Sequence, residues 1–93
     1  MTLQRYKPNT TVACVIHCQQ KFLLVEEIID GQVCFNQPAG HIDALETIPQ
    51  ACKREVNEET GLDIELVGLI GIYQFSADDQ LAFVRFTFAA ESE

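Results

Sequence analysis

Three carboxylates, Glu55, Glu58 and Glu59, are the residues whose type and spacing point most clearly to chemistry. In a helix of about 3.6 residues per turn, Glu55 and Glu59 fall near the centre of the apolar stripe, and Glu58 falls at its edge. Burying carboxylates without a compensating charge is costly. Mg²⁺ and Mn²⁺ prefer carboxylate oxygens, so the spacing predicts a divalent-cation site. The alternative is a frayed helix end whose three carboxylates are solvated.

The helix that carries these carboxylates has start and stop signals. Thr47 is a good N-cap, and Gln50 completes a capping box with it. Pro49 is compatible with a first helical turn, and Gly61 suits the position after the last turn. We therefore expect a helix over residues 48–60. The residues expected on its inner face are Ile48, Ala51, Cys52 and Val56.

Strands are expected on both sides of this helix. Asp30-Gly31 predicts a two-residue hairpin, the apolar run over residues 22–25 predicts burial on both faces, and residues 37–41 predict a loop. The expected strands cover residues 10–17, 21–29, 32–36, 63–75 (as one or two strands) and 81–89. The last strand alternates, with Phe83, Arg85, Thr87 and Ala89 on one face and Val84, Phe86 and Phe88 on the other. One helix among several strands predicts an α+β domain with a mixed sheet.

The size and charge of the chain limit the classes of function. Its 93 residues, 47% of them hydrophobic, suit one small packed domain over residues 1–93. A net charge of -8 argues against a nucleic-acid polymer as partner. The N-terminal sequence is not typical of a signal peptide, and no apolar run approaches the roughly 18 residues of a membrane span. We expect a cytoplasmic protein without a membrane partner.

The four cysteines, Cys14, Cys18, Cys34 and Cys52, do not predict a metal site. None of them forms a C-x-x-C pair, so zinc binding is not expected. We interpret them as small buried apolar residues or free thiols.

A longer motif resembles a known family. Gly40, five residues, Glu46, seven residues and then Arg54-Glu55-Val56-Asn57-Glu58-Glu59-Thr60-Gly61-Leu62 looks like a complete box of the Nudix hydrolase superfamily, the MutT-like proteins. The resemblance implies an α/β/α sandwich around a mixed sheet. It also implies hydrolysis of a nucleoside diphosphate linked to another moiety, assisted by Mg²⁺ or Mn²⁺.

The resemblance assigns roles to residues of the box. The metal ligands it implies are Glu55, Glu58, Glu59 and the Gly40 carbonyl. The catalytic group is Glu55, Glu58, Arg54 and Glu46. Arg54 would orient a carboxylate by pairing with Glu46 or Glu58. Glu55 would orient or deprotonate the attacking water.

A second, less specific resemblance concerns the sequence before the box. Residues 35–41, Phe-Asn-Gln-Pro-Ala-Gly-His, and the earlier residues 11–15 look like the NudJ phosphatase subgroup. This implies a small phosphorylated substrate, either a nucleoside di- or triphosphate or a pyrophosphorylated compound of the thiamine pathway. Gln37, His41 and Phe35 are the candidate substrate contacts. A simple loop position for His41 and a core position for Phe35 are the alternatives.

The chain stops soon after its last expected strand, whereas Nudix domains usually continue with another helix and further strands. We therefore expect the C-terminal helix and strands to be missing and some apolar sheet surface to be exposed. A homodimer would cover such a surface. A truncated module that binds metal and phosphate with little catalysis is the alternative to an enzyme, and a generic acidic scaffold is a third hypothesis.

Overall fold

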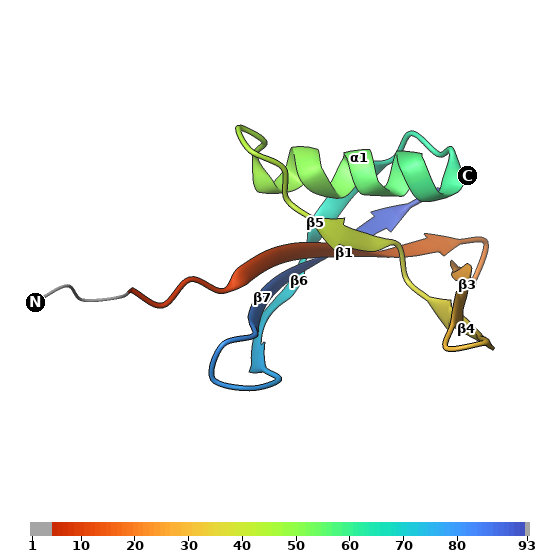
Figure 1. The fold of residues 1–93 in the computed structure, drawn as a ribbon. Helices are drawn as coiled ribbons and strands as arrows, with labels where there is room; N and C mark the ends of the chain where they lie inside the picture. Colours follow the sequence, from red (N-terminus) through yellow and green to blue (C-terminus); the bar gives the residue numbers. More distant parts are fainter. Residues whose placement is uncertain (1–4, 93) are drawn as a thin grey trace, which may run out of the picture.

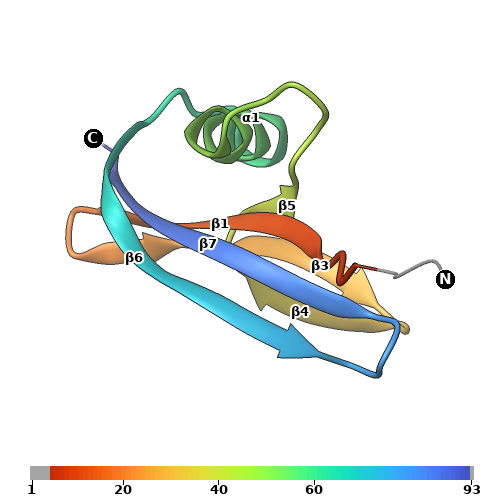
Figure 2. The same ribbon diagram turned by 90° about the vertical axis from the view of Figure 1, so that its left-hand side faces the viewer.

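A computed structural model describes residues 5–92 of the chain, and in it one helix lies across one face of a mixed sheet (Figures 1 and 2). The strands are β1 (Asn9–Cys18), β2 (Lys21–Leu23), β3 (Val25–Ile29), β4 (Gln32–Asn36), β5 (Ala39–His41), β6 (Glu65–Ser76) and β7 (Ala82–Glu91), and the helix is α1 (Ile48–Thr60). The predicted α+β class with a mixed sheet is confirmed.

Strand β1 organises the larger sheet. It pairs antiparallel with β2 and with β5, and parallel with β7, whose other edge pairs antiparallel with β6. Strands β3 and β4 form a separate antiparallel pair. Strand β5 therefore brings residues 39–41 from the segment before the helix directly against β1.

The helix begins and ends as its sequence signals predicted. The Thr47 hydroxyl accepts a hydrogen bond from the Gln50 backbone N–H, and the Gln50 side chain accepts one from the Thr47 N–H. Gly61 adopts φ 76°, the left-handed conformation that commonly ends a helix. These caps fix where the last turn lies, and that turn carries Glu58 and Glu59.

The core lies between α1 and the sheet. The inner face of the helix buries Ala51, Cys52 and Val56 against Val12, Cys14 and Ile16 of β1, with Phe86 and Phe88 of β7 packed against them. The alternation predicted for residues 81–89 is therefore confirmed. All four cysteines are free, as expected. Contact with Cys14 and burial raise the pKa of Cys52, so this thiol behaves as a packing residue.

Two strand predictions were wrong. Residues 21–29 do not form one strand, because the chain leaves the main sheet at Leu24 and enters the β3–β4 hairpin. Phe22 and Leu24, expected to be buried on both faces, are 65% and 50% exposed. Residues 37–41 are not only a loop, since Ala39–His41 is strand β5. The hairpin turn itself is correct, with Asp30 and Gly31 both at positive φ.

The sheet face opposite α1 carries no helix from residues 5–92. Residues 63–75 were expected to form one or two strands, and β6 is one long strand with register shifts next to Gly68 and Gly71. It lies at the edge of the sheet and exposes the large apolar side chains Val67, Leu69, Ile70, Ile72, Tyr73 and Phe75. No helix within the described residues is both long and apolar enough to cross a membrane.

Candidate active site

Glu55 lies against the backbone of strand β5. Its carboxylate occupies the space that a Cβ at residue 40 would take, so a side chain there would displace this carboxylate. Gly40 pairs with Val12 in the β1–β5 ladder, between two hydrogen bonds that join Cys14 to Pro38 and Ile42 to Thr10. Antiparallel bonding repeats every second residue, so we expect the Gly40 carbonyl to face β1 with one lone pair left for another partner.

The Arg54 guanidinium donates hydrogen bonds to three carboxylates of this site. Its Nε and Nη2 donate to the two oxygens of Glu46 at 2.5 and 3.0 Å, a bidentate pair. Its Nη1 donates to Glu55 at 2.9 Å and to Glu58 at 3.2 Å. Its Nη2 also donates to the His41 carbonyl at 2.9 Å, which ties the helix to the end of β5. The predicted pairing of Arg54 therefore takes place with both candidate partners.

The protonation behaviour of this group follows from the same contacts. The hydrogen bond from Arg54 lowers the pKa of Glu46, and the backbone N–H of Asp43, which donates to Glu46 at 2.9 Å, acts in the same direction. The bonds to Glu46 and then to Glu55 raise the pKa of Arg54. Arg54 thus stays a fixed cation and Glu46 a fixed anion, a pair suited to holding Glu55 in place.

Glu59 lies in the last turn of α1, where it meets two other carboxylates. Partial burial raises the pKa of Glu59, the charges of Glu55 and Glu27 raise it further, and a backbone hydrogen bond from Ala39 opposes them. Glu27 comes from β3, far from the helix in sequence. Burial first, and then the neighbouring carboxylates, disfavour the charged form of Glu59.

The donor chemistry of this cluster fits a hard divalent cation. The side chains are carboxylates, and the charge of a cation would relieve the repulsion that raises the pKa of Glu59. No group of three or more His, Cys, Asp or Glu residues is already arranged as a metal cage within the part of the chain that the structure describes. One reason is that Glu58 turns toward Arg54, with its side chain 58% exposed.

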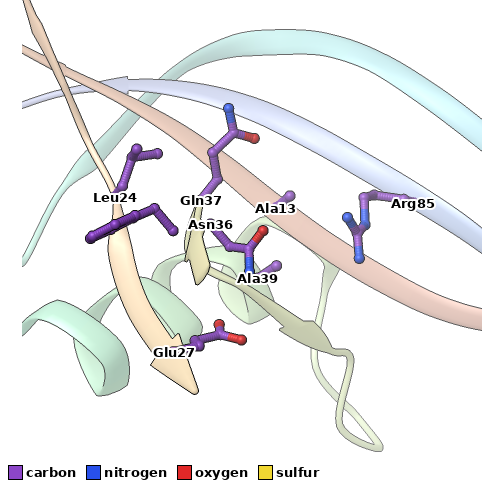
Figure 3. A pocket seen from close by; sticks show the side chains of 8 residues that line it. Ala13, Leu24, Glu27, Asn36, Gln37, Ala39 and Arg85 are labelled. Atoms are coloured by element: carbon purple, nitrogen blue, oxygen red, sulfur yellow. The ribbon is translucent and has the colours of Figure 1, made fainter. Parts of the chain in front are cut away.

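A hollow of about 500 Å³ lies beside β5, with Glu27 in its lining (Figure 3). Its lining residues are Ala13, Leu24, Glu27, Phe35, Asn36, Gln37, Ala39 and Arg85. Two of them, Glu27 and Ala39, also act on Glu59. The hollow therefore adjoins the carboxylate cluster at Glu27 and Ala39.

The three predicted substrate contacts do not all line the hollow. Phe35 and Gln37 line the hollow, whereas His41 does not and lies exposed in β5. Phe35 is 63% exposed, so the core alternative for it is wrong. Glu27 and Arg85 were missed, because both lie outside the motif of residues 40–62, in strands that are distant from it in sequence. The available signal was the charge of Arg85 on the strand face opposite Phe86 and Phe88.

Comparison with known proteins agrees with this geometry. The family model described as the NUDIX domain matches residues 6–93. Phosphatase NudJ of Escherichia coli strain K12 is 49% identical over 88 residues, which make up 95% of this chain and 58% of that protein. The chain therefore spans less than two thirds of the length of this curated relative.

Solved structures show the same architecture. A NUDIX hydrolase from Nitrosomonas europaea matches with a TM-score of 0.82 and 49% identity, over 91% of this chain and 59% of that one. The MutT protein from Methanosarcina mazei Go1 matches with a TM-score of 0.79 over 97% of this chain and 69% of that one. Its identity is 21%, so this second match concerns the fold alone.

Proposed function

Because this chain belongs to the Nudix family, we propose that it is a divalent-cation-dependent hydrolase that cleaves a phosphoanhydride bond in a small phosphorylated molecule. The observation that carries the proposal is the fixed position of Glu55. Its carboxylate fits against Gly40, and Arg54, which Glu46 holds in turn, donates to it. A site whose acidic groups are held in this way suits the positioning of a water molecule beside phosphorus.

The carboxylates have distinct roles in this proposal. Glu55, Glu58, Glu59 and the Gly40 carbonyl hold Mg²⁺, with Mn²⁺ as a substitute. The cation would neutralise phosphate charge and lower the pKa of bound water. Glu55 would also orient or deprotonate the attacking water, and Glu58, which accepts a hydrogen bond from Arg54, would be a further ligand. Arg54 and Glu46 position Glu55 and do not contact the phosphate.

The substrate is proposed to lie in the hollow beside the carboxylates. Phe35 and Leu24 offer apolar surface for a ring, and the side-chain amides of Asn36 and Gln37 offer donors and acceptors for its polar edge. Nucleoside di- and triphosphates and pyrophosphorylated thiamine compounds are the candidate substrates. The likeness to a phosphatase of E. coli supports a phosphorylated substrate. His41 stays a candidate contact at the edge of this region.

Phosphate release from a panel of nucleotides and thiamine diphosphate, with Mg²⁺ or with EDTA, tests this function. We expect release from at least one compound with Mg²⁺ only, and its loss in Glu58→Gln. Calorimetric titration of Mg²⁺ runs in parallel. Bound Mg²⁺ without release from any compound would contradict the enzyme and favour a module that only binds metal and phosphate.

We also propose that two copies associate through the edge strand β6. Its exposed apolar residues run from Val67 to Phe75, and Glu65 is the only charged residue of the strand. Sheet edges are normally protected by charges, which this edge lacks over most of its length. The cytoplasm is the proposed location, because four free thiols suit a reducing compartment.

A further inference from the structure

Arg85 lies in the middle of β7 on the sheet face that turns away from the helix. Its register partners are Thr11 on β1 and Tyr73 on β6, so both cross-strand neighbours are uncharged. Its Nε donates to the Thr11 hydroxyl at 3.3 Å, and the contact is partly buried. A guanidinium in a fork geometry, with one donor engaged, has further donors for a ligand.

No carboxylate of residues 5–92 lies within 4.0 Å of the Arg85 guanidinium. Arg54 shows the opposite arrangement, with four carboxylates around it. A partly buried cation without an anion loses hydration and gains no ion pair in return. The stability of the fold therefore does not explain an arginine at this position, whereas the binding of an anionic ligand would explain it.

Among residues 5–92, Arg85 is also the only cation in the lining of the hollow. In the view of Figure 3, Arg85 and Glu27 lie at separate sides, with Asn36 and Ala39 between them. The small side chains of Ala13 and Ala39 also line the hollow. The hollow thus has an acidic side, next to Glu59, and a basic side at Arg85.

We propose that Arg85 is an oxyanion-binding residue of this hollow, and that it binds phosphate oxygens of the substrate on the side away from the carboxylates. The inference rests on the proposed function, because it places the same substrate. It adds that the phosphate chain lies between the acidic and the basic side. Arg85 can bind two oxygens of one phosphate through its fork, which a lysine cannot do.

Titration of inorganic pyrophosphate in EDTA tests this proposal without any cation. The chain has a net charge of -8 and three carboxylates beside the hollow, so binding of this anion needs a local positive group. We expect Arg85→Met to weaken the affinity at least about tenfold, the size expected for one charge-assisted hydrogen bond. Arg85→Lys should restore part of it.

The matched control is Lys53→Met, which removes one positive charge from the outer face of α1, where Lys53 pairs with Glu65 at 3.3 Å. We expect this variant to bind pyrophosphate almost as the wild type does. Equal affinity in Arg85→Met and wild type, or an equal loss in Lys53→Met, would overturn the assignment. Absence of pyrophosphate binding by the wild type would overturn it too.

The Arg side-chain Nε–H signals of the wild type give a second readout that needs no variant to fold. We expect pyrophosphate in EDTA to shift the Arg85 signal and leave that of Arg54 in place, because carboxylates already surround Arg54. A shift of Arg54 alone would contradict the proposal. Since no cation is present, these results do not depend on catalysis, and a failure of the proposed hydrolysis would be seen separately in the release assay.

Discussion

At the scale of single residues, the closest fit in the site is between Gly40 and Glu55. The backbone of Gly40 does not need glycine for its conformation, because its φ is not positive. What needs glycine is the space that the Glu55 carboxylate occupies. The absence of a side chain at residue 40 and the hydrogen bond from Arg54 therefore both determine the position of this carboxylate.

Gly40→Ala should displace the Glu55 carboxylate while leaving the strand able to form. We expect phosphate release to fall about 100-fold, the loss that a misplacement of about 1 Å can cause. Gly68→Ala is the control, because a Cβ there meets no atom within 4 Å. Equal rates in the two variants would show that the position of Glu55 does not matter for the reaction.

Glu59 gives the site a dependence on pH. Its pKa is raised in the folded chain, first by burial and then by Glu55 and Glu27. A folded pKa above the unfolded value means that the contribution of Glu59 to stability is fully present below about pH 4.3 and is lost as the pH rises through the folded pKa. Without a cation, Glu59→Gln should therefore melt at a higher temperature than the wild type, by a margin that grows with pH.

Thermal melts in EDTA between about pH 4 and pH 7 measure this difference in melting temperature between Glu59→Gln and the wild type. Asp79→Asn is the control, since it removes one negative charge from the exposed turn before β7. We expect no comparable growth of the margin in that variant. A margin for Glu59→Gln that shrinks as the pH rises would show that the sign of the pKa shift is wrong.

At the scale of elements, the capped helix holds the acidic residues in register with β5. The Thr47 cap and the Gln50 side chain satisfy backbone groups at the start of α1. Thr47→Ala should lower the free energy of unfolding by about 1 kcal/mol, and Thr47→Ser should restore most of it. Urea unfolding monitored by circular dichroism measures both, and an unchanged midpoint in Thr47→Ala would contradict the role of the cap.

The sequence predicted those elements whose signals are local. The caps at Thr47 and Gly61 defined the helix, and Asp30-Gly31 defined the hairpin, because each signal acts within a few residues. The break at Leu24 and the short strand β5 were not predictable in this way. Strand β5 depends on pairing with β1, which is far away along the chain. Leu24 is the point where pairing passes from the β1–β2 hairpin to the β3–β4 hairpin, and the apolar run over residues 22–25 contained no signal of that change.

The residues of the site likewise differ in whether their place could be predicted from the sequence. The helical part of the box could be located because its residues are close in sequence, and Arg54 contacts Glu46 and Glu58 as predicted. Glu27 and Arg85 reach the same region from β3 and β7. Their place follows only from the topology of the sheet, so no spacing rule could have selected them.

At the scale of the whole molecule, the fold leaves one side of the sheet without a covering layer from residues 5–92. The expectation of a Nudix-type fold with exposed apolar sheet surface is confirmed by the structural matches and by the exposure along β6. The membership inferred from the motif and the likeness to NudJ are confirmed as well.

Ile72→Lys tests the proposed association of two copies. Ile72 is 57% exposed on β6, so a lysine there should leave the fold intact and separate the copies by repulsion. Light scattering after gel filtration should give twice the chain mass for the wild type and the chain mass for the variant. Ile28→Lys, at a 76% exposed position of the β3–β4 hairpin, should stay a dimer. A monomeric wild type would contradict the association.

The proposed hydrolysis requires that the carboxylates of α1 catalyse cation-dependent cleavage. The most direct measurement is the initial rate of phosphate release against Mg²⁺ concentration, for the wild type and Glu55→Gln, with the best substrate of the panel. We predict a rate that saturates with Mg²⁺ in the wild type and falls at least about 100-fold in Glu55→Gln. Release that persists in EDTA, or that Glu55→Gln retains in full, would contradict the account.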